Sequence, residues 1–435
     1  MYFCKRKMRI YAKKVCNMEI VRDLYLKKLI DSKHNGMIKV VTGLRRSGKS
    51  YLLFKLFYNH LVDNGIDKNH IVKVDLEDRR NKALRNPDAL LAHIDGKMTD
   101  NQMYYILLDE IQLVNDFEDV LNSYLKIENA DVYVTGSNSR FLASDVITEF
   151  RGRGDEIRVA PLSFGEFMSI YEGSRENALE EYMTFGGLPA IPSMPTAEKK
   201  TSYLKSLFEK TYLSDIKERY RINNDSDLEE LINVVASSIG GLTNPTKLEN
   251  TFRSVKKSDI THVTIKKYID ILQDTYLINK AVRYDIKGRR YIDTPSKYYF
   301  TDIGLRNARL DFRQNEVTHA MENIVYNELC VRGFNVDVGM ITYNSKDAQG
   351  KSVRIQLEVD FVCNRGSQRY YIQSAWRLSN EDKREQETRS LRQIKDNFKK
   401  FVITDDPIRR YRDENGVIYM NIYEFLLEEK SLEIE

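Results

Sequence analysis

The residues best suited to chemistry lie in one glycine-rich segment, Gly43-Leu-Arg-Arg-Ser-Gly-Lys-Ser50, which has the form G-x-x-x-x-G-K-S. Glycines allow backbone conformations in which successive N–H groups point into one concavity and bind phosphate oxygens. The lysine can reach the β- and γ-phosphates, and the following serine can ligate Mg²⁺. The segment therefore predicts an ATP and Mg²⁺ site, with Ser50 on the metal. We expect these residues to bind the nucleotide: Gly43, Arg46, Ser47, Gly48, Lys49, Ser50 and Tyr51.

A pair of adjacent carboxylates, Asp109 and Glu110, follows the apolar run Tyr104–Leu108. A carboxylate next to a bound cation stays ionised at neutral pH, so Asp109 suits the Mg²⁺. Glu110 could then polarise the water that attacks the γ-phosphate. We therefore expect Asp109 to be a metal ligand and Glu110 to be the catalytic base of ATP hydrolysis.

Two further segments carry candidates for contact with the γ-phosphate. Thr135-Gly-Ser-Asn-Ser139 directly follows a strand-like run, which makes Asn138 or Ser137 a candidate for touching this phosphate or the attacking water. Arg151-Gly-Arg-Gly154 supplies guanidinium groups that could stabilise the transferring phosphoryl group, either from a neighbouring subunit or within one chain. The alternative for the first segment is a plain turn, and the alternative for the second is a solvated arginine loop; neither would contact the phosphate.

Residues 37–165, which contain all of these candidate side chains, show alternating strand and helix patterns. Such alternation predicts an α/β fold, a three-layer P-loop ATPase core with a mostly parallel sheet. An amphipathic helix is expected at 19–33 and another at 51–61, directly after the glycine-rich segment. The expected strands are 37–42, 71–76, 104–108, 131–136 and 156–160.

The sequence pattern of the remaining chain predicts a series of smaller parts. We expect a helical lid or linker at 166–225, a helical unit that ends in a hairpin at 226–310, and a second, smaller α/β unit at 311–435. Helices followed by a two-stranded hairpin are the order of a winged helix. Residues 1–36 would form a basic leader and the first helix.

Composition limits the class of protein. The 435 residues carry 68 basic and 64 acidic side chains, so the net charge of +4 neither demands nor excludes nucleic acid. No apolar window is long enough to span a membrane, and the four cysteines form no C-x-x-C pair. We therefore expect a cytoplasmic protein with no membrane partner and no zinc.

Several segments, in order along the chain, resemble one protein family: Gly43–Ser50, Leu107–Gln112, Thr135–Ser139, Gly152-Arg153, Pro161–Phe167, Phe185–Pro189 and Thr301–Leu305. Together they are similar to the prokaryotic AAA+-like ATPases that carry a C-terminal domain of unassigned function. The resemblance implies an AAA+ core, a winged helix and a nuclease-like C-terminal fold. It favours Arg153 over Arg151 as an arginine finger, which would imply self-association.

The C-terminal part resembles the PD-(D/E)xK nuclease layout, in which a helix glutamate, a strand aspartate and an E-x-K segment on the next strand bind metal and activate water. Glu322 and Asp360 match the helix glutamate and the strand aspartate. However, Gln373 stands where the second strand acid belongs, and Ala375 stands where the lysine belongs. A neutral amide is a poor ligand for a hard cation, so we expect a degenerate site without cleavage.

DNA is the partner that the sequence favours. Cations of the expected helix and wing could contact phosphates without reading sequence, and they are Lys266, Lys267, Arg289 and Arg290. The leading hypothesis is an ATPase that couples hydrolysis to action on DNA. A nucleotide-dependent protein-interaction switch and an ATP-regulated nuclease are the alternatives.

Overall fold

The computed structural model describes residues 20–136, 153–222, 225–256, 259–314, 316–346 and 350–433. The chain divides into two compact units. The first extends to Leu162 and includes two short later segments, Leu188–Ser193 and Asp274–Tyr276; the second contains the remaining residues. No helix in these described ranges is long and apolar enough to cross a lipid bilayer.

A five-stranded parallel sheet forms the centre of the first unit, with the strand order β2-β3-β4-β1-β5. All six residues of β3 are buried, as expected for a strand that is covered on both faces. This confirms the parallel α/β core, and each strand lies within two residues of its predicted bounds. The strands are β1 (Ile38–Thr42), β2 (Ile71–Asp75), β3 (Tyr104–Asp109), β4 (Ala130–Thr135) and β5 (Gly154–Arg158).

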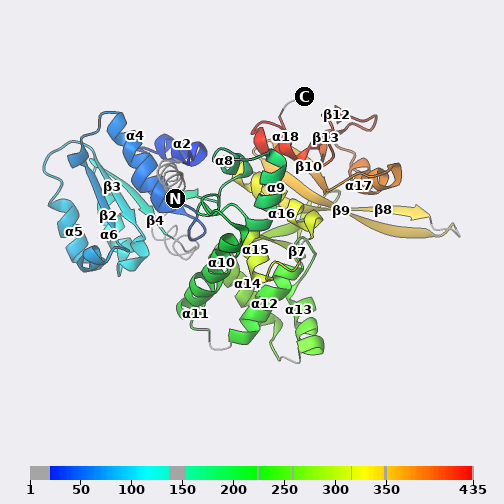
Figure 1. Cartoon of the computed structure of the whole chain (residues 1–435), viewed down its shortest axis with the longest axis horizontal. Coiled ribbons are helices and arrows are strands. Elements are labelled where there is room, and N and C mark those ends of the chain that lie inside the picture. The colour runs from blue at the N-terminus through cyan, green and yellow to red at the C-terminus, as the bar shows by residue number, and fades with distance from the viewer. Residues whose placement is uncertain are drawn as a thin grey trace, which may run out of the picture. The chain divides into compact units, whose positions relative to one another are not determined.

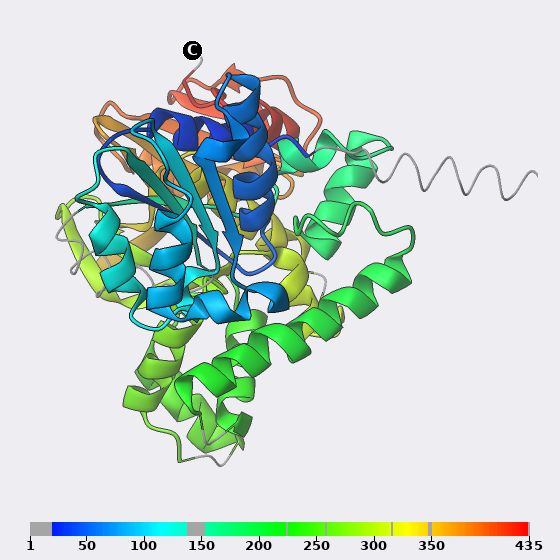
Figure 2. The same cartoon turned by 90° about the vertical axis from the view of Figure 1, so that its left-hand side faces the viewer.

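Helices cover both faces of this sheet (Figures 1 and 2). On one face, α2 (Asp23–Asp31) and the helix after β1 pack Leu29, Phe57 and Leu61 against the strands. That helix runs without interruption through α3 (Lys49–Tyr51), a π-helical segment (Leu52–Phe57) and α4 (Tyr58–Asp63). The other face is covered by α5 (Pro87–Asp95) and α6 (Phe117–Tyr124). Short 3₁₀ turns lie at Lys68–His70, Arg79–Arg85 and Ile111–Leu113.

The second unit is built on an eight-stranded mixed sheet with the order β12-β13-β11-β10-β9-β8-β6-β7. The hairpin expected as a wing belongs to this sheet, because β6 pairs in parallel with β8. The sheet therefore runs across the boundary predicted at residue 310. Its strands are β6 (Ile278–Asp285), β7 (Arg290–Phe300), β8 (Asn335–Lys346), β9 (Ser352–Arg365), β10 (Gln368–Ala375), β11 (Lys399–Thr404), β12 (Tyr411–Arg412) and β13 (Val417–Asn421).

Beyond Met340, β8 pairs only with β9, and the two strands continue as a two-stranded ribbon (Figure 1). Strands β8, β12 and β13 were not predicted from the sequence.

Helices of the second unit precede and surround this sheet. The helices are α8 (Phe164–Met168), α9 (Arg175–Phe185), α10 (Ala197–Leu207), α11 (Ser214–Tyr220), α12 (Asp225–Ser237), α13 (Pro245–Thr251), α14 (His262–Asp274), α15 (Ile303–Arg309), α16 (Val317–Val331), α17 (Glu381–Arg392) and α18 (Ile422–Leu427), with π-helical segments at Phe208–Leu213 and Phe252–Lys256.

Candidate functional site

The glycine-rich segment forms a tight loop between β1 and α3. Gly43 has φ +129°, and a Cβ there would lie 2.1 Å from the carbonyl oxygen of Val159, so only glycine fits. Gly48 has φ +97° and caps the helix. The ammonium of Lys49 is 4% exposed and donates to the carbonyl oxygens of Gly43 and Leu44, both at 3.1 Å. The loop thus holds its lysine at the helix N-terminus, where a phosphate group would bind.

The other predicted nucleotide ligands lie around this lysine. Arg46 and Ser50 are exposed, while Tyr51 is half-buried. Ser47 is fully buried, and its Oγ has no hydrogen-bond partner among the described residues. Burial lowers the pKa of Lys49, and the nearby carboxylates of Glu110 and Asp109 oppose this shift. The structure therefore brings the glycine-rich loop and the two predicted acids into one electrostatic site.

An arginine that the sequence analysis missed supports the loop from outside. Arg22 is 2% exposed and donates from its two terminal nitrogens to the carbonyl oxygens of Ser47, at 3.0 Å, and Ala160, at 2.7 Å. The residue lies before the first helix, and no local pattern marks it. Its contacts fix the loop relative to the segment that follows β5.

Thr135 links the two predicted acids. Its Oγ1 donates to Asp109 Oδ1 at 2.5 Å and accepts from the backbone N–H of Glu110 at 3.0 Å. The strand order explains this contact, since β4 lies between β3 and β1 and ends beside both motifs. Glu110 has φ +52°, and its carboxylate accepts from the side-chain amide of Gln112.

Asn138 and Ser137, the candidates expected at this strand end, lie outside the described residues, as does Arg151.

Asp109 gives the site a testable pH dependence. Burial raises the pKa of Asp109 to about 6, although hydrogen bonds from Thr135 and Ser50 favour the ionised form. Because the folded pKa lies above the unfolded one, the nucleotide-free protein loses stability as the pH rises from about 4 through about 6. The loss is at most about 3 kcal/mol, and Asp109→Asn should remove it.

Thermal unfolding of the nucleotide-free wild type and Asp109→Asn at about pH 4 and about pH 7 measures this difference. The variant should gain stability relative to the wild type at the higher pH. An equal effect of the substitution at both pH values would show that Asp109 does not titrate in this range.

Arg153 lies at the amino-terminal end of β1, whereas the glycine-rich loop follows the carboxyl-terminal end of this strand. Its carbonyl oxygen accepts from the N–H of Ile38, the first residue of β1, at 3.0 Å, while the loop follows the last residue, Thr42. The four residue steps between these strand ends span about 13 Å. The side chain is exposed. The sheet therefore separates Arg153 from the phosphate-binding loop of its own chain.

The residues of the degenerate nuclease layout also come together, in the second unit. Glu322 of α16 and Asp360 of β9 are each 7% exposed. Gln373 of β10 accepts from the N–H of Asp360 at 3.4 Å. A residue that the sequence analysis missed, Lys297 of β7, places its ammonium 2.9 Å from Glu322 and 3.8 Å from Asp360. This lysine comes from the predicted wing, so no motif spacing could have identified it.

Two of the four predicted nucleic-acid contacts, Lys266 and Arg289, border two different hollows. Lys266 and Lys267 are exposed on α14, and Lys266 lines a hollow of about 660 Å³ with residues of α13. Arg289 lines another hollow, of about 560 Å³, together with residues near β10 and α17. Arg290 is exposed and lies 3.6 Å from the carboxylate of Asp285. The helix and hairpin cations thus form two groups.

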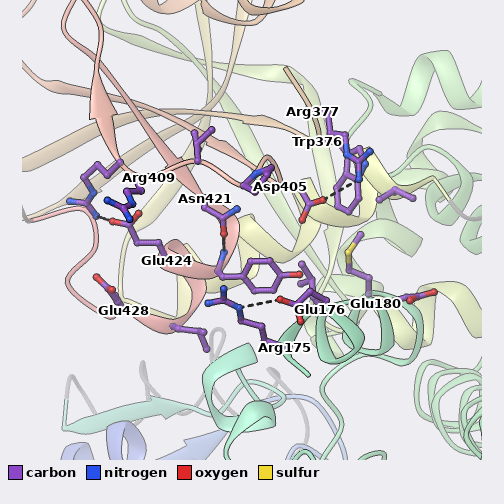
Figure 3. Close-up of a pocket in the computed structure, with 18 of the residues that line it drawn as sticks. Arg175, Glu176, Glu180, Trp376, Arg377, Asp405, Arg409, Asn421, Glu424 and Glu428 are labelled. Atoms are coloured by element: carbon purple, nitrogen blue, oxygen red, sulfur yellow. Dashed lines mark hydrogen bonds and ion pairs between the residues drawn. The ribbon is translucent and has the colours of Figure 1, made fainter. Parts of the chain in front are cut away.

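A crevice of about 1000 Å³ lies at the carboxyl ends of β10, β11 and β13 (Figure 3). Asp406 connects the three strand ends: its carboxylate accepts from the N–H of Leu378 at 2.8 Å and from Thr404 Oγ1 at 2.9 Å, and its carbonyl accepts from Asn421 at 2.7 Å. The lining includes Trp376, the only tryptophan of the chain.

The charges of this crevice are mixed in sign. Its charged lining residues are four arginines and five acids: Arg175, Arg377, Arg409, Arg410, Glu176, Glu180, Asp405, Glu424 and Glu428. A surface with this balance does not attract a polyanion. Tryptophan, tyrosine, methionine and arginine are residue types enriched at protein interfaces, and all four line this crevice.

Comparison with known protein families assigns two parts of the chain. Residues 35–168 match a family described as an AAA domain, and residues 176–316 match a domain of unknown function, DUF8612. The first match contains the glycine-rich loop, the acid pair and Thr135.

Two relatives match over most of the chain. An uncharacterized protein of Haemophilus influenzae is 34% identical over 391 residues, which are 88% of this chain and 93% of that protein. The uncharacterized protein MJ1544 of Methanocaldococcus jannaschii is 28% identical over 393 residues, which are 87% and 82% of the two chains. Among solved structures, the Aeropyrum pernix ORC1 protein in complex with DNA aligns with 11% identity and a TM-score of 0.30, over 68% of this chain and 93% of that one.

Proposed function

Because this chain belongs to the same protein family as its Haemophilus influenzae relative and its residues 35–168 match an AAA domain, we propose that it hydrolyses MgATP at the loop between β1 and α3. In this proposal the ATPase cycle is coupled to a partner. The family and the fold make it a nucleotide-binding AAA+ ATPase. The observation that carries the proposal is the convergence of Lys49, Asp109 and Glu110 at the carboxyl ends of β1 and β3, the two parallel strands on either side of β4.

Each group at this site has a separate task in the proposal. The backbone N–H groups of the loop bind the phosphates, and Lys49 neutralises their developing charge. Ser50 and Asp109 would hold Mg²⁺, a hard cation that prefers oxygen ligands. Glu110 orients the attacking water and accepts its proton. Thr135 fixes the carboxylate of Asp109 and the backbone of Glu110, and is therefore a positioning residue.

Arg153 would act on the nucleotide of a neighbouring copy, because the sheet separates it from its own loop. We expect Arg153→Ala to lower ATP turnover about 1000-fold while leaving nucleotide binding unchanged. Mixing this variant with Lys49→Ala, which keeps its arginine but lacks its own lysine, should restore part of the activity. Rates that stay at the level of the separate variants would exclude a finger acting between subunits.

DNA is the partner that we propose first. Exposed cations on α14 and at the hairpin tip support it, as does the β8–β9 ribbon, which carries Lys346, Lys351 and Arg354. A two-stranded ribbon fits the major groove of duplex DNA. The experiment is ATP hydrolysis with and without single- and double-stranded DNA, in which stimulation of the wild type supports a DNA-coupled ATPase.

A protein partner is the second candidate, and the crevice at β10, β11 and β13 favours it. Its mixed charges and its aromatic lining suit a polypeptide better than a nucleic acid. ATP hydrolysis that is indifferent to both forms of DNA would favour this candidate. Trp376 then provides a direct test, because its fluorescence reports occupancy of the crevice.

A further inference from the structure

The carboxylate cluster of the second unit surrounds a single ammonium group. Lys297 is 3% exposed, and its Nζ lies 2.9 Å from Glu322 Oε1, 2.7 Å from Glu358 Oε1 and 3.8 Å from Asp360 Oδ1. The acids come from α16 and β9, whereas the cation comes from β7. A buried charge is tolerated only when partners compensate it, so these four side chains depend on one another.

Other donors and a close backbone contact complete the cluster. Tyr299 Oη donates to Glu322 Oε1 at 2.7 Å, and the N–H of Ser374 donates to Asp360 Oδ2 at 2.8 Å. A Cβ on Gly240, which has φ +71°, would lie 3.1 Å from both carboxylate oxygens of Glu322. These contacts hold the acids around the ammonium.

Electrostatics keep the lysine charged. Burial disfavours the ammonium, but the carboxylates of Glu322, Asp360 and Glu358 outweigh it and raise the pKa of Lys297 above its ordinary value. Burial and the neighbouring Glu322 raise the pKa of Asp360 well above its usual range. The cluster therefore retains its internal cation throughout the neutral pH range.

We propose that the Lys297 ammonium is the resident cation of this cluster, in the place where the nuclease layout that the sequence resembles would bind a divalent metal ion. Carboxylates gather around Mg²⁺ or Mn²⁺ to compensate the positive charge, and here a side chain supplies that charge. In the part of the chain that the structure describes, no group of three or more His, Cys, Asp or Glu side chains is placed to hold a metal.

The second unit then needs no metal and cuts no nucleic acid. This inference is independent of ATP turnover in the first unit.

The first test replaces the ammonium with a neutral side chain of similar length. Lys297→Met leaves the buried carboxylates uncompensated, so we expect its melting temperature to fall by roughly 10 °C. The matched control is Lys280→Met, which removes a half-buried lysine from β6 of the same hairpin and should change the melting temperature little. Equal melting temperatures for the two variants would overturn the proposal.

The second test asks whether a divalent cation can take the place of the lysine. Without nucleotide, Mn²⁺ should raise the melting temperature of Lys297→Met more than that of the wild type, which shares the same ATP site. Terbium emission sensitised by Tyr299 should also appear in the variant and disappear when Glu322→Gln is added. The proposal fails if Mn²⁺ stabilises both proteins equally, or if the wild type cuts DNA in a metal-dependent way that Asp360→Asn abolishes.

A double variant keeps the proposal testable if Lys297→Met does not fold. Lys297→Met combined with Glu322→Gln removes one positive and one negative charge together, so it should recover part of the lost stability. A double variant no more stable than Lys297→Met, or equally unable to fold, would contradict the role of Lys297 as the counter-ion.

Discussion

Lys49→Ala is expected to lower the affinity for MgATP about 100-fold, because the substitution removes charge-assisted hydrogen bonds to the phosphates. The buried ammonium is already positioned by the carbonyl oxygens of Gly43 and Leu44, so little ordering is needed when phosphate binds. Isothermal titration with a slowly hydrolysed ATP analogue and Mg²⁺ measures the loss.

Lys73→Ala is the matched control, since this lysine is exposed on β2. It should bind the analogue as the wild type does. Unchanged affinity in Lys49→Ala would remove the basis for placing the nucleotide at this loop.

Glu110→Gln has the second large expected effect, on turnover rather than on binding. The amide keeps the size of the side chain but cannot accept the proton of the attacking water, so hydrolysis should fall by about 10²- to 10⁴-fold. The N–H of Glu110 that bonds Thr135 belongs to the backbone, and the substitution leaves it in place. ATP affinity should therefore stay close to that of the wild type.

Glu128→Gln provides the control for this substitution, because Glu128 is an exposed acid just before the amino end of β4. Phosphate release by this variant should match the wild type. Equal losses in both variants would indicate a general effect of charge rather than a base at Glu110.

The segments that form the proposed nucleotide site were largely predictable because each of them is local in sequence. The loop from Gly43 to Ser50 and the acids after β3 each lie in one short segment, and the apolar strands before them have a clear burial pattern. Arg22 and Thr135 act through contacts between distant segments. The first has no sequence signature, and the second was recognised only as part of a strand end.

The second unit was harder to predict because its key contacts cross the predicted parts. Lys297 is one lysine among many in the sequence, and only the pairing of β6 with β8 brings its hairpin into the sheet that carries Asp360. The outer half of β8 pairs with β9 alone, and none of its side chains after Ile341 is fully buried. These residues therefore lack the apolar pattern that predicts a strand. The resemblance to the nuclease layout identified Glu322 and Asp360, whereas Lys297 became evident only from the fold.

The steady-state rate of phosphate release at saturating MgATP, compared between the wild type and Glu110→Gln, tests most directly whether ATP is hydrolysed at this loop. We expect steady turnover by the wild type and its loss in the variant, with nucleotide still bound. Equal rates for the two proteins, or no turnover by the wild type with or without DNA, would contradict hydrolysis at this site.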